Sequence, residues 1–136
     1  MGSEGAISLY IIDDDFIFRT AAAVFVEQEG FSNSVEEFEN GLEGFERLHA
    51  LCEAGEQLPD AIFLDINMPV MNGWEFLEEL KTIDPRVRAE CAIFILTSSI
   101  DHGDYMLSTE YDFINGYITK PLTKEDLNKI KSELNS

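Results

Sequence analysis

The sequence predicts a three-layer α/β/α sandwich, in which helices cover both faces of a five-stranded parallel sheet. The first observation is that short apolar runs alternate with longer amphipathic segments along the 136 residues. The second is that the apolar runs contain almost no polar residue, as expected for strands that are covered on both faces. Strands that alternate with helices in this way pair in parallel through right-handed crossovers. The expected strand order is 2-1-3-4-5.

Five apolar runs are the expected strands, and polar groups follow four of them. We place the strands at residues 7–12, 32–38 (the weakest run), 61–65, 92–97 and 113–118. The polar groups are Asp13, Asp14 and Asp15, then Asp65, then Thr97 and Ser98, and last Lys120. Because the carboxyl ends of parallel strands meet at one edge of a sheet, these side chains are expected to share one crevice. A lone Asp65 would prove little, since a strand-end Asp often caps the next helix.

The segments between the strands have helical periodicity. Helices are expected at residues 16–29, 41–54, 74–83, around 101–110 and from Thr123 to 134. The residues that recur at three- and four-residue spacing are Ile17, Ala21, Val24, Phe25 and Gln28; Leu42, Phe45, Leu48 and Cys52; Trp74, Leu77, Leu80 and Ile83; and Leu127, Ile130 and Leu134. Gly30, Gly55 and Pro85 mark helix ends, and Thr123 suits an N-cap. The segment 101–110 is poorly periodic, so a short or irregular helix is expected there.

Length and charge restrict the class of protein. The chain suits one domain, expected at residues 7–134, with residues 1–6 as a disordered N-terminus or a cloning scar. The 27 acidic residues against 9 basic ones give a net charge of −18, which disfavours binding to nucleic acid. No apolar run suits a membrane span and no secretion signal is present, so we expect a cytoplasmic protein. We expect free, buried thiols at Cys52 and Cys91 and surface positions for His49 and His102.

Over residues 7–134 the sequence resembles the receiver domain of response regulators in two-component signalling. The motifs that carry the resemblance are Asp13-Asp14 after the first strand, Asp65 and the Pro- and Gly-containing loop that follows it, Thr97, Tyr117 and Lys120-Pro121. Each motif is weak alone, and the signal lies in their order along successive strand ends. The resemblance implies a flavodoxin-like fold, a phosphoryl acceptor at Asp65, a switch hydroxyl at Thr97, an aromatic switch at Tyr117 and a phosphate contact from Lys120.

Three carboxylates in one crevice require a positive charge among them. At ~4 Å and an effective dielectric of ~20, each pair of like charges costs about 4 kcal/mol. A site of oxygen ligands that also receives a phosphate oxygen suits Mg²⁺, with Mn²⁺ as the other choice. The expected direct ligands are Asp14, Asp65 and the backbone carbonyl of Asn67, with Asp13 acting through water. Asp15 is either the N-cap of the first helix or a supporting group at this site.

The resemblance implies a signalling role rather than enzymatic turnover. Asp65 is expected to take a phosphoryl group from the phosphohistidine of a sensor histidine kinase or a histidine phosphotransfer protein. Thr97 would then shift toward the phosphate and Tyr117 would turn inward. These movements would change the face formed by the segments 101–110 and 113–118 and the last helix, where a downstream protein target would bind.

Two other functions and two local interpretations stay open. One alternative is a degenerate receiver that binds proteins without being phosphorylated. Another is a haloacid-dehalogenase-like phosphatase, because residues 13–15 supply half of its Asp-x-Asp-x-Thr/Val motif, although Ile17 replaces the Thr or Val. Tyr117 is either the switch or an ordinary strand aromatic. The bond between Lys120 and Pro121 either ends the strand in the common trans form or is cis, and we expect cis.

Overall fold

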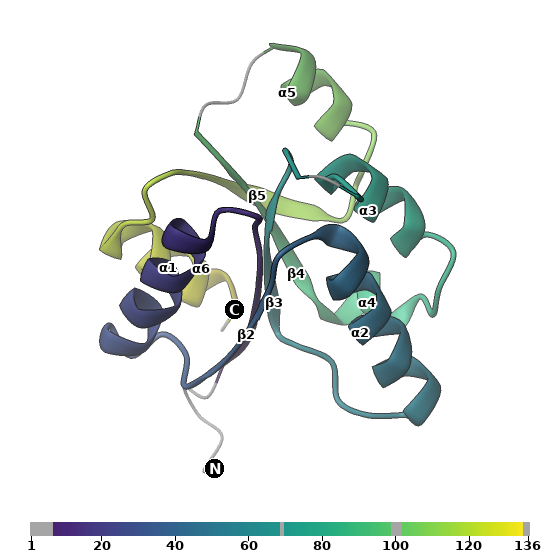
Figure 1. Cartoon of the computed structure of the whole chain (residues 1–136), viewed down its shortest axis with the longest axis horizontal. Coiled ribbons are helices and arrows are strands. Elements are labelled where there is room, and N and C mark those ends of the chain that lie inside the picture. Colours follow the sequence, from purple (N-terminus) through teal and green to yellow (C-terminus); the bar gives the residue numbers. More distant parts are fainter. Residues whose placement is uncertain (1–6, 69, 99–101, 135–136) are drawn as a thin grey trace.

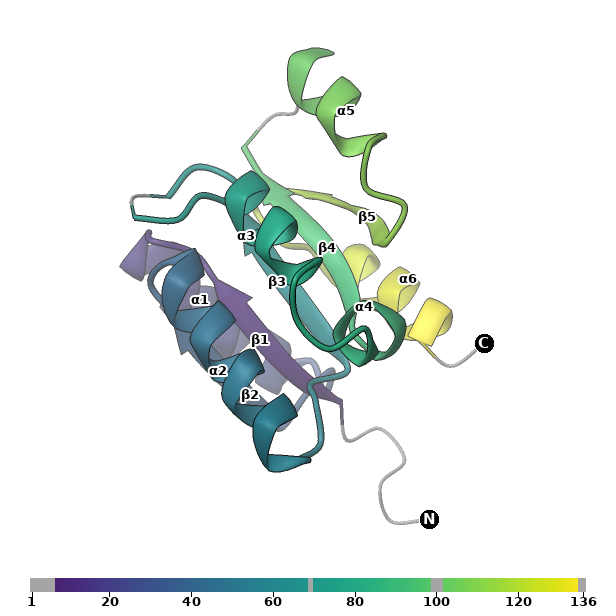
Figure 2. The ribbon, with the colours of Figure 1, turned by 90° about the vertical axis from the view of Figure 1, so that its right-hand side faces the viewer.

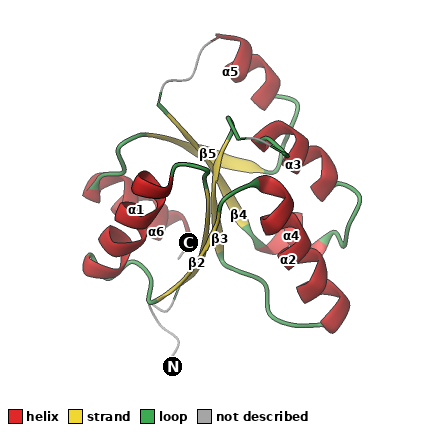
Figure 3. Cartoon of the chain, in the orientation of Figure 1, coloured by secondary structure: helices red, strands yellow, loops and turns green. Residues whose placement is uncertain are grey.

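Five parallel strands form one sheet in the order β2-β1-β3-β4-β5 (Figures 1 and 3). The strands are β1 (Ser8–Ile12), β2 (Ser34–Phe38), β3 (Ala61–Asp65), β4 (Ala92–Thr97) and β5 (Ile114–Thr119). The computed structural model describes residues 7–68, 70–98 and 102–134. The predicted flavodoxin-like topology is therefore confirmed, and the predicted strands differ from the observed ones by at most two residues at either end.

Helices cover both faces of the sheet (Figures 1 and 2). One face carries α1 (Phe16–Gln28) and α6 (Lys124–Leu134), and the other carries α2 (Gly41–Ala54), α3 (Gly73–Leu80) and the short α4 (Arg86–Glu90). α5 (His102–Ser108) stands clear of both layers in both views. The sequence did not predict α4, because five residues are too few to establish a helical period.

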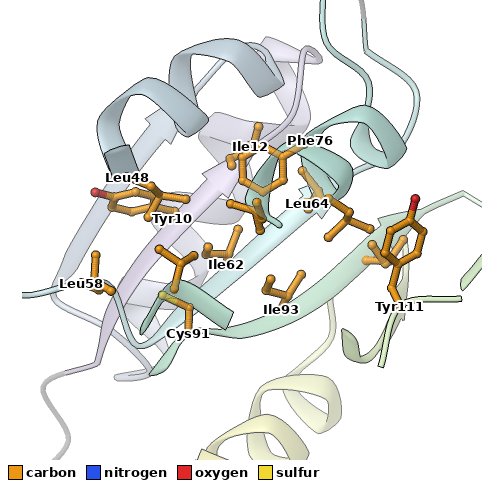
Figure 4. Close-up of a cluster of buried hydrophobic side chains, with 14 of the residues drawn as sticks. Tyr10, Ile12, Leu48, Leu58, Ile62, Leu64, Phe76, Cys91, Ile93 and Tyr111 are labelled. Atoms are coloured by element: carbon orange, nitrogen blue, oxygen red, sulfur yellow. The ribbon is translucent and has the colours of Figure 1, made fainter. Parts of the chain in front are cut away.

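Each face of the sheet has its own hydrophobic core. The core under α2 and α3 takes alternate strand residues, including Tyr10, Ile12, Ile62, Leu64 and Ile93 (Figure 4). The core under α1 and α6 takes the residues between them, including Leu9, Ile11, Phe63, Phe94 and Leu96. Full burial of one such side chain stabilises the fold by about 1.5–3 kcal/mol. Because both faces are buried, a shift of register would misplace every strand residue, so the strand ends are fixed relative to one another.

Most of the predicted stripe of α1 does not face the core, and of its five residues only the half-buried Phe25 packs against it. The helix buries Ala22, Ala23 and Val26 instead, whereas Ile17 is 79% exposed and Val24 is 48% exposed. The segment is apolar almost all round, so spacing alone cannot identify the inner face. Because Ala22 and Ala23 are small, α1 can lie close to the sheet when this face of the helix is turned inward.

A similar difference occurs in α2. The predicted Leu48 is fully buried, but Leu42 is exposed, and the inner stripe is completed by Gly41, Gly44 and Leu51. A Cβ atom at Gly44 would lie only 2.6 Å from Cδ1 of Ile12, so glycine permits the close approach of α2 to β1. Small residues therefore define the inner faces of both α1 and α2.

Gly55 and Thr123 mark helix ends as predicted, whereas Pro85 does not: α3 ends at Leu80, and Pro85 is the N-cap residue of α4. Gly55 ends α2 in the left-handed conformation, with φ 68°. Thr123 caps α6, because its Oγ1 accepts from the Asp126 N–H at 3.1 Å while the Asp126 carboxylate accepts from the Thr123 N–H at 2.9 Å. Both hydrogen bonds satisfy N–H groups that the helix itself leaves unpaired.

The remaining expectations concern single residues and the chain ends. Cys91 is buried, Cys52 is half-buried and both are free thiols, and burial raises the pKa of the Cys91 thiol to about 12. His49 is exposed, as predicted, whereas the side chain of His102 and residues 1–6 lie outside the described part. Among the described helices, none has the length and apolar character that crossing a bilayer requires.

Candidate functional site

The register of the sheet brings the predicted polar residues to one edge. Asp65 ends β3 opposite Leu96, and Thr97 follows directly as the last residue of β4. Thr97 in turn pairs with Thr119 at the end of β5, and the N–H of Lys120 donates to the Thr97 carbonyl at 2.8 Å. The expected convergence of the strand ends is therefore present in the backbone itself.

The carboxylates of Asp13, Asp14 and Asp65 form one cluster. Each offers an oxygen, and these oxygens all lie within 4.8 Å of one another. Asp13 is fully buried, Asp65 is 6% exposed and Asp14 is exposed to solvent. Among the described residues this is the group that could hold a metal ion. One side of the cluster is thus sealed by protein, and Asp14 opens the other side to solvent.

The environment of Asp65 opposes its negative charge. Burial, followed by repulsion from Asp13, raises the pKa of the Asp65 carboxyl from 3.8 to about 7, and attraction to Lys120 offsets only part of this shift. The site therefore contains more negative charge than its own lysine neutralises.

Lys120 reaches into the cluster from the end of β5. Its Nζ lies 2.7 Å from Oδ2 of Asp13 and 3.8 Å from Oδ1 of Asp65. The peptide bond between Lys120 and Pro121 is cis, as predicted. The ammonium is thus placed between the two buried carboxylates.

The cluster has the chemistry of a site for a hard divalent cation. Asp13 Oδ1 accepts from the Asp15 N–H at 2.8 Å, but the buried Oδ2 accepts no hydrogen bond of suitable angle, although it is paired in charge with Lys120. Three carboxylates against one ammonium leave an excess of two negative charges. Oxygen ligands with this excess fit Mg²⁺ or a similar ion. The backbone N–H of Asn67 donates to Asp65 Oδ1 at 3.4 Å and so helps to orient that carboxylate.

Asp15 caps α1. Its side chain accepts from the Phe18 N–H at 3.1 Å, which is the bond expected of an N-cap residue. The interpretation of Asp15 as the N-cap of the first helix is therefore confirmed.

The sequence prediction missed Arg19. This arginine is 9% exposed, and its Nη1 donates to the backbone carbonyl of Asp13 at 2.6 Å. Its Nε donates to Glu37 at 3.2 Å. The guanidinium therefore ties α1 to β2 and holds the backbone of the acidic loop. The available signal was that Arg19 is the single basic residue of a largely apolar helix. It lies four residues after the N-cap Asp15.

Replacing Arg19 with Ala is expected to lower the free energy of unfolding by about 1–3 kcal/mol, because the buried Asp13 carbonyl loses its donor. Urea unfolding followed by far-UV circular dichroism, in EDTA, measures this difference. Arg47→Ala is the matched control, since Arg47 pairs with Glu36 at 3.5 Å on the surface and its loss should cost less than about 1 kcal/mol. Equal losses in the two variants would contradict the role assigned to Arg19.

The predicted switch residues lie on the neighbouring strands β4 and β5. Thr97 is 3% exposed, whereas Tyr117 on β5 is 38% exposed.

The segment after α5 is fixed by Tyr111, whose hydroxyl donates to Glu78 at 2.7 Å and whose ring stacks on Trp74. α3 is thereby joined to the chain that leads into β5.

The loop after Asp65 is packed tightly against the strand end. A Cβ atom at Gly73 would lie 2.7 Å from the Asp65 carbonyl oxygen, so the start of α3 lies directly against the backbone of the site. Val70 within this loop has φ 68°, an unfavourable value for a β-branched residue. Trp74, the second residue of α3, is the single tryptophan of the chain and so an internal fluorescence probe near the site.

Comparison with known proteins agrees with this geometry. The family model for the response regulator receiver domain matches residues 9–131. The chain is 26% identical over 132 residues to the probable methanogenesis regulatory protein FilR2 of Methanothrix harundinacea, which covers 97% of this chain and 83% of that protein. It is 29% identical over 131 residues to the nitrate/nitrite response regulator NarL of Escherichia coli K12, which covers 95% of this chain and 55% of that protein.

The fold comparison gives the same family. A two-component response regulator from Cytophaga hutchinsonii superimposes with a TM-score of 0.86 at 28% identity, covering 96% of this chain and 98% of that one. The chain spans about half the length of several curated relatives, including NarL and the transcriptional regulator CreB of Escherichia coli.

Proposed function

The chain belongs to the response regulator receiver family, whose members are signalling phosphoacceptors rather than turnover enzymes, and we propose that Asp65 is its acceptor residue. The single observation that supports this assignment most strongly is the cluster at the sheet edge. Three carboxylate oxygens lie within 4.8 Å of one another, and Lys120 lies between the two that are buried. Burial and repulsion from Asp13 raise the pKa of the Asp65 carboxyl to about 7 in the metal-free protein, so a cation beside it would relieve an unfavourable charge.

The reaction is a displacement at phosphorus. A carboxylate oxygen of Asp65 forms a bond to the phosphorus atom while the bond between phosphorus and the imidazole nitrogen of the donor breaks. The imidazole leaves with the electron pair of that bond, and the product is an acyl phosphate on Asp65. Lys120 and the Thr97 hydroxyl hold the phosphoryl oxygens, so positioning and charge neutralisation provide most of the acceleration.

We assign the metal ion as Mg²⁺, with Mn²⁺ as the alternative. Asp14, Asp65 and the backbone carbonyl of Asn67 would be its direct ligands, and Asp13 would act through water. When bound, the ion neutralises charge on the phosphoryl oxygens and on the carboxylates. With Lys120 it brings three positive charges to three negative ones, which leaves the resting site near neutrality. The buried Oδ2 of Asp13, which accepts no hydrogen bond of suitable angle, and the raised pKa of Asp65 support this assignment.

We further propose that the donor is the phosphohistidine of a sensor histidine kinase or a histidine phosphotransfer protein, and that the protein acts in the cytoplasm. Phosphorylation draws Thr97 toward the phosphate, and the exposed Tyr117 ring turns inward. The responding surface is α5, β5 and α6, where the exposed large apolar residues include Tyr105, Met106, Leu107 and Tyr117. This surface is the proposed site for the downstream protein target.

The energy of one phosphoryl group is sufficient for such a switch. A hydrogen bond to a charged group contributes ~1.5–3 kcal/mol, so new bonds from Thr97 and Lys120 supply about 3–6 kcal/mol. Moving a two-state equilibrium from 1:99 to 99:1 takes about 5.5 kcal/mol. The free energy of the new hydrogen bonds is therefore of the same size as the free energy that the switch requires.

The test is incubation of the protein with Mg²⁺ and acetyl phosphate, followed by intact mass spectrometry. We expect a mass gain of one phosphoryl group that EDTA prevents, and a change in Trp74 fluorescence with either acetyl phosphate or beryllofluoride. Mg²⁺ binding without any mass gain, from small donors or from a histidine kinase, would indicate the degenerate receiver instead. Steady turnover of p-nitrophenyl phosphate would indicate a phosphatase.

A further inference from the structure

The aromatic ring of Phe18 lies against the ammonium of Lys120. The Nζ atom is 4.4 Å from the centroid of the ring, which is within the range of a cation–π interaction. The same Nζ is 2.7 Å from Asp13 Oδ2 and 3.8 Å from Asp65 Oδ1. The ammonium thus has one carboxylate neighbour directly after β1, another at the end of β3, and an aromatic neighbour from α1.

The side chain of Phe18 packs at the margin of the core under α1 and α6, as does Leu122 of the segment that follows Lys120. Phe18 lies in the first turn of α1, where its N–H is bonded to the capping side chain of Asp15. Its side chain is half-buried and borders, with Pro121 and Leu122, a shallow pocket of about 140 Å³ beside the end of β5. The ring therefore lies beside the same segment that carries the lysine.

An aromatic face differs from the other neighbours of Lys120 in one respect. It attracts a cation through its quadrupole but accepts no strong directional hydrogen bond. A carboxylate or carbonyl in this place would compete for the ammonium protons that the phosphoryl oxygens need. The ring instead leaves those protons available to the oxygens of Asp13 and Asp65, and the Lys120 side chain is only 17% exposed.

We propose that Phe18 is a positioning residue for Lys120, which holds the ammonium at the acceptor through the electrostatics of its ring and not only through packing. This inference rests on the proposed function, in which Lys120 contacts the incoming phosphoryl group. The effect of the ring is exerted through Lys120, and Phe18 itself does not touch the phosphoryl donor.

The first measurement is the rate of Asp65 phosphorylation by acetyl phosphate at saturating Mg²⁺. Phe18→Leu retains an apolar side chain without a π face and is expected to slow the reaction about three- to thirtyfold. Phe18→Tyr and Phe18→Trp, which retain the π face, should stay near the wild-type rate. Phe25→Leu is the matched control, because Phe25 borders the same pocket on the same helix without a cation over its ring in the described structure.

Fluorinated phenylalanines at position 18 separate ring electrostatics from packing. Each added fluorine weakens the negative face of the ring with little change of shape, so the logarithm of the rate should fall steadily from phenylalanine to trifluorophenylalanine. A rate that is flat across the fluorinated series, or a Phe18→Leu rate equal to that of wild type, would overturn the proposal. The series remains decisive if the leucine variant fails to fold.

A second readout does not depend on phosphorylation. If the ring lies over the ammonium in solution, the methylene protons next to Nζ of Lys120 should show an upfield ring-current shift in NMR spectra. The shift should disappear in Phe18→Leu and persist in Phe25→Leu. A normal shift in the wild-type protein contradicts the present inference, whereas a shifted lysine in a protein that never gains a phosphoryl group contradicts the proposed function alone.

Discussion

Replacing Asp65 with Asn is expected to abolish phosphoryl uptake and, at the same time, to stabilise the metal-free protein at pH 8. The loss of uptake follows from removal of the nucleophilic oxygen, since a neutral amide does not form the acyl phosphate. The gain in stability follows from the position of Asp65 beside Asp13 in a largely buried site. A residue that is needed for function is thus expected to reduce the stability of the fold.

The pH dependence of this effect has a definite sign. The Asp65 carboxyl has a pKa near 3.8 in the unfolded chain and about 7 in the folded one. Between these values the folded protein holds a proton that the unfolded chain has lost, so the free energy of unfolding falls as the pH rises through this window. The full cost, present above pH 7, is on the order of 4 kcal/mol. Burial of the new amide costs about 1–2 kcal/mol, which leaves a net gain of about 2–3 kcal/mol at pH 8.

Urea unfolding in EDTA at pH 5 and pH 8, together with intact mass after treatment with acetyl phosphate, measures both parts. Asp15→Asn is the matched control, because it removes one carboxylate from the same loop and still supplies an N-cap for α1. The control should be phosphorylated normally and should gain little stability. Phosphorylation of Asp65→Asn, or a stability difference from wild type that is the same at both pH values, would count against the assignment.

The sequence predicted the site better than it predicted the helices. Asp13, Asp65 and Lys120 were identifiable because each stands where an apolar run stops, and parallel strands bring such positions to one edge. Two-sided burial of the strands then fixes those positions in space. The chemistry of the site is therefore contained in the order of polar residues after strands.

The helix faces were less predictable, for a physical reason. A helical period is identified from large apolar residues, but α1 and α2 contact the sheet through alanine and glycine. At Gly44, for example, an added Cβ atom would lie 2.6 Å from Cδ1 of Ile12. Ile17 and Leu42, which fit the expected stripes, lie on the outside. The placement of Arg19 depends on this same choice of face, because only the observed orientation directs its guanidinium to the Asp13 carbonyl. Its supporting role therefore could not be recognised before the orientation of α1 was known.

The contact between Phe18 and Lys120 was hidden for a related reason. The two residues are far apart in the sequence, and neither strand order nor helical period gives the distance between a first-turn side chain and the end of β5. The ring lies 4.4 Å from Nζ only because the inner face of α1 is the alanine face. Contacts between a helix face and a strand end thus require the three-dimensional structure.

The affinity for Mg²⁺ is expected to fall by about fiftyfold between pH 7 and pH 5. Below pH 7 the metal-free protein carries a proton on Asp65, whose pKa is raised to about 7, and the ion has to displace it. Displacement of one proton weakens binding about tenfold for each pH unit below that pKa, and the affinity should be nearly constant above it. Protonation competes for the same oxygen that the metal needs.

Titration of the wild-type protein with Mg²⁺ at several pH values, followed by Trp74 fluorescence or calorimetry, measures this dependence. Calorimetry in two buffers of different ionisation enthalpy should also detect release of nearly one proton at pH 6 and of almost none at pH 8. Asp65→Asn should bind Mg²⁺ more weakly, with most of the pH dependence removed, because the amide cannot be protonated in this range. An affinity in the wild-type protein that is equal at pH 5 and pH 8 would contradict a metal site in which Asp65 is a ligand and has a raised pKa, since such a carboxyl has to lose its proton when the ion binds.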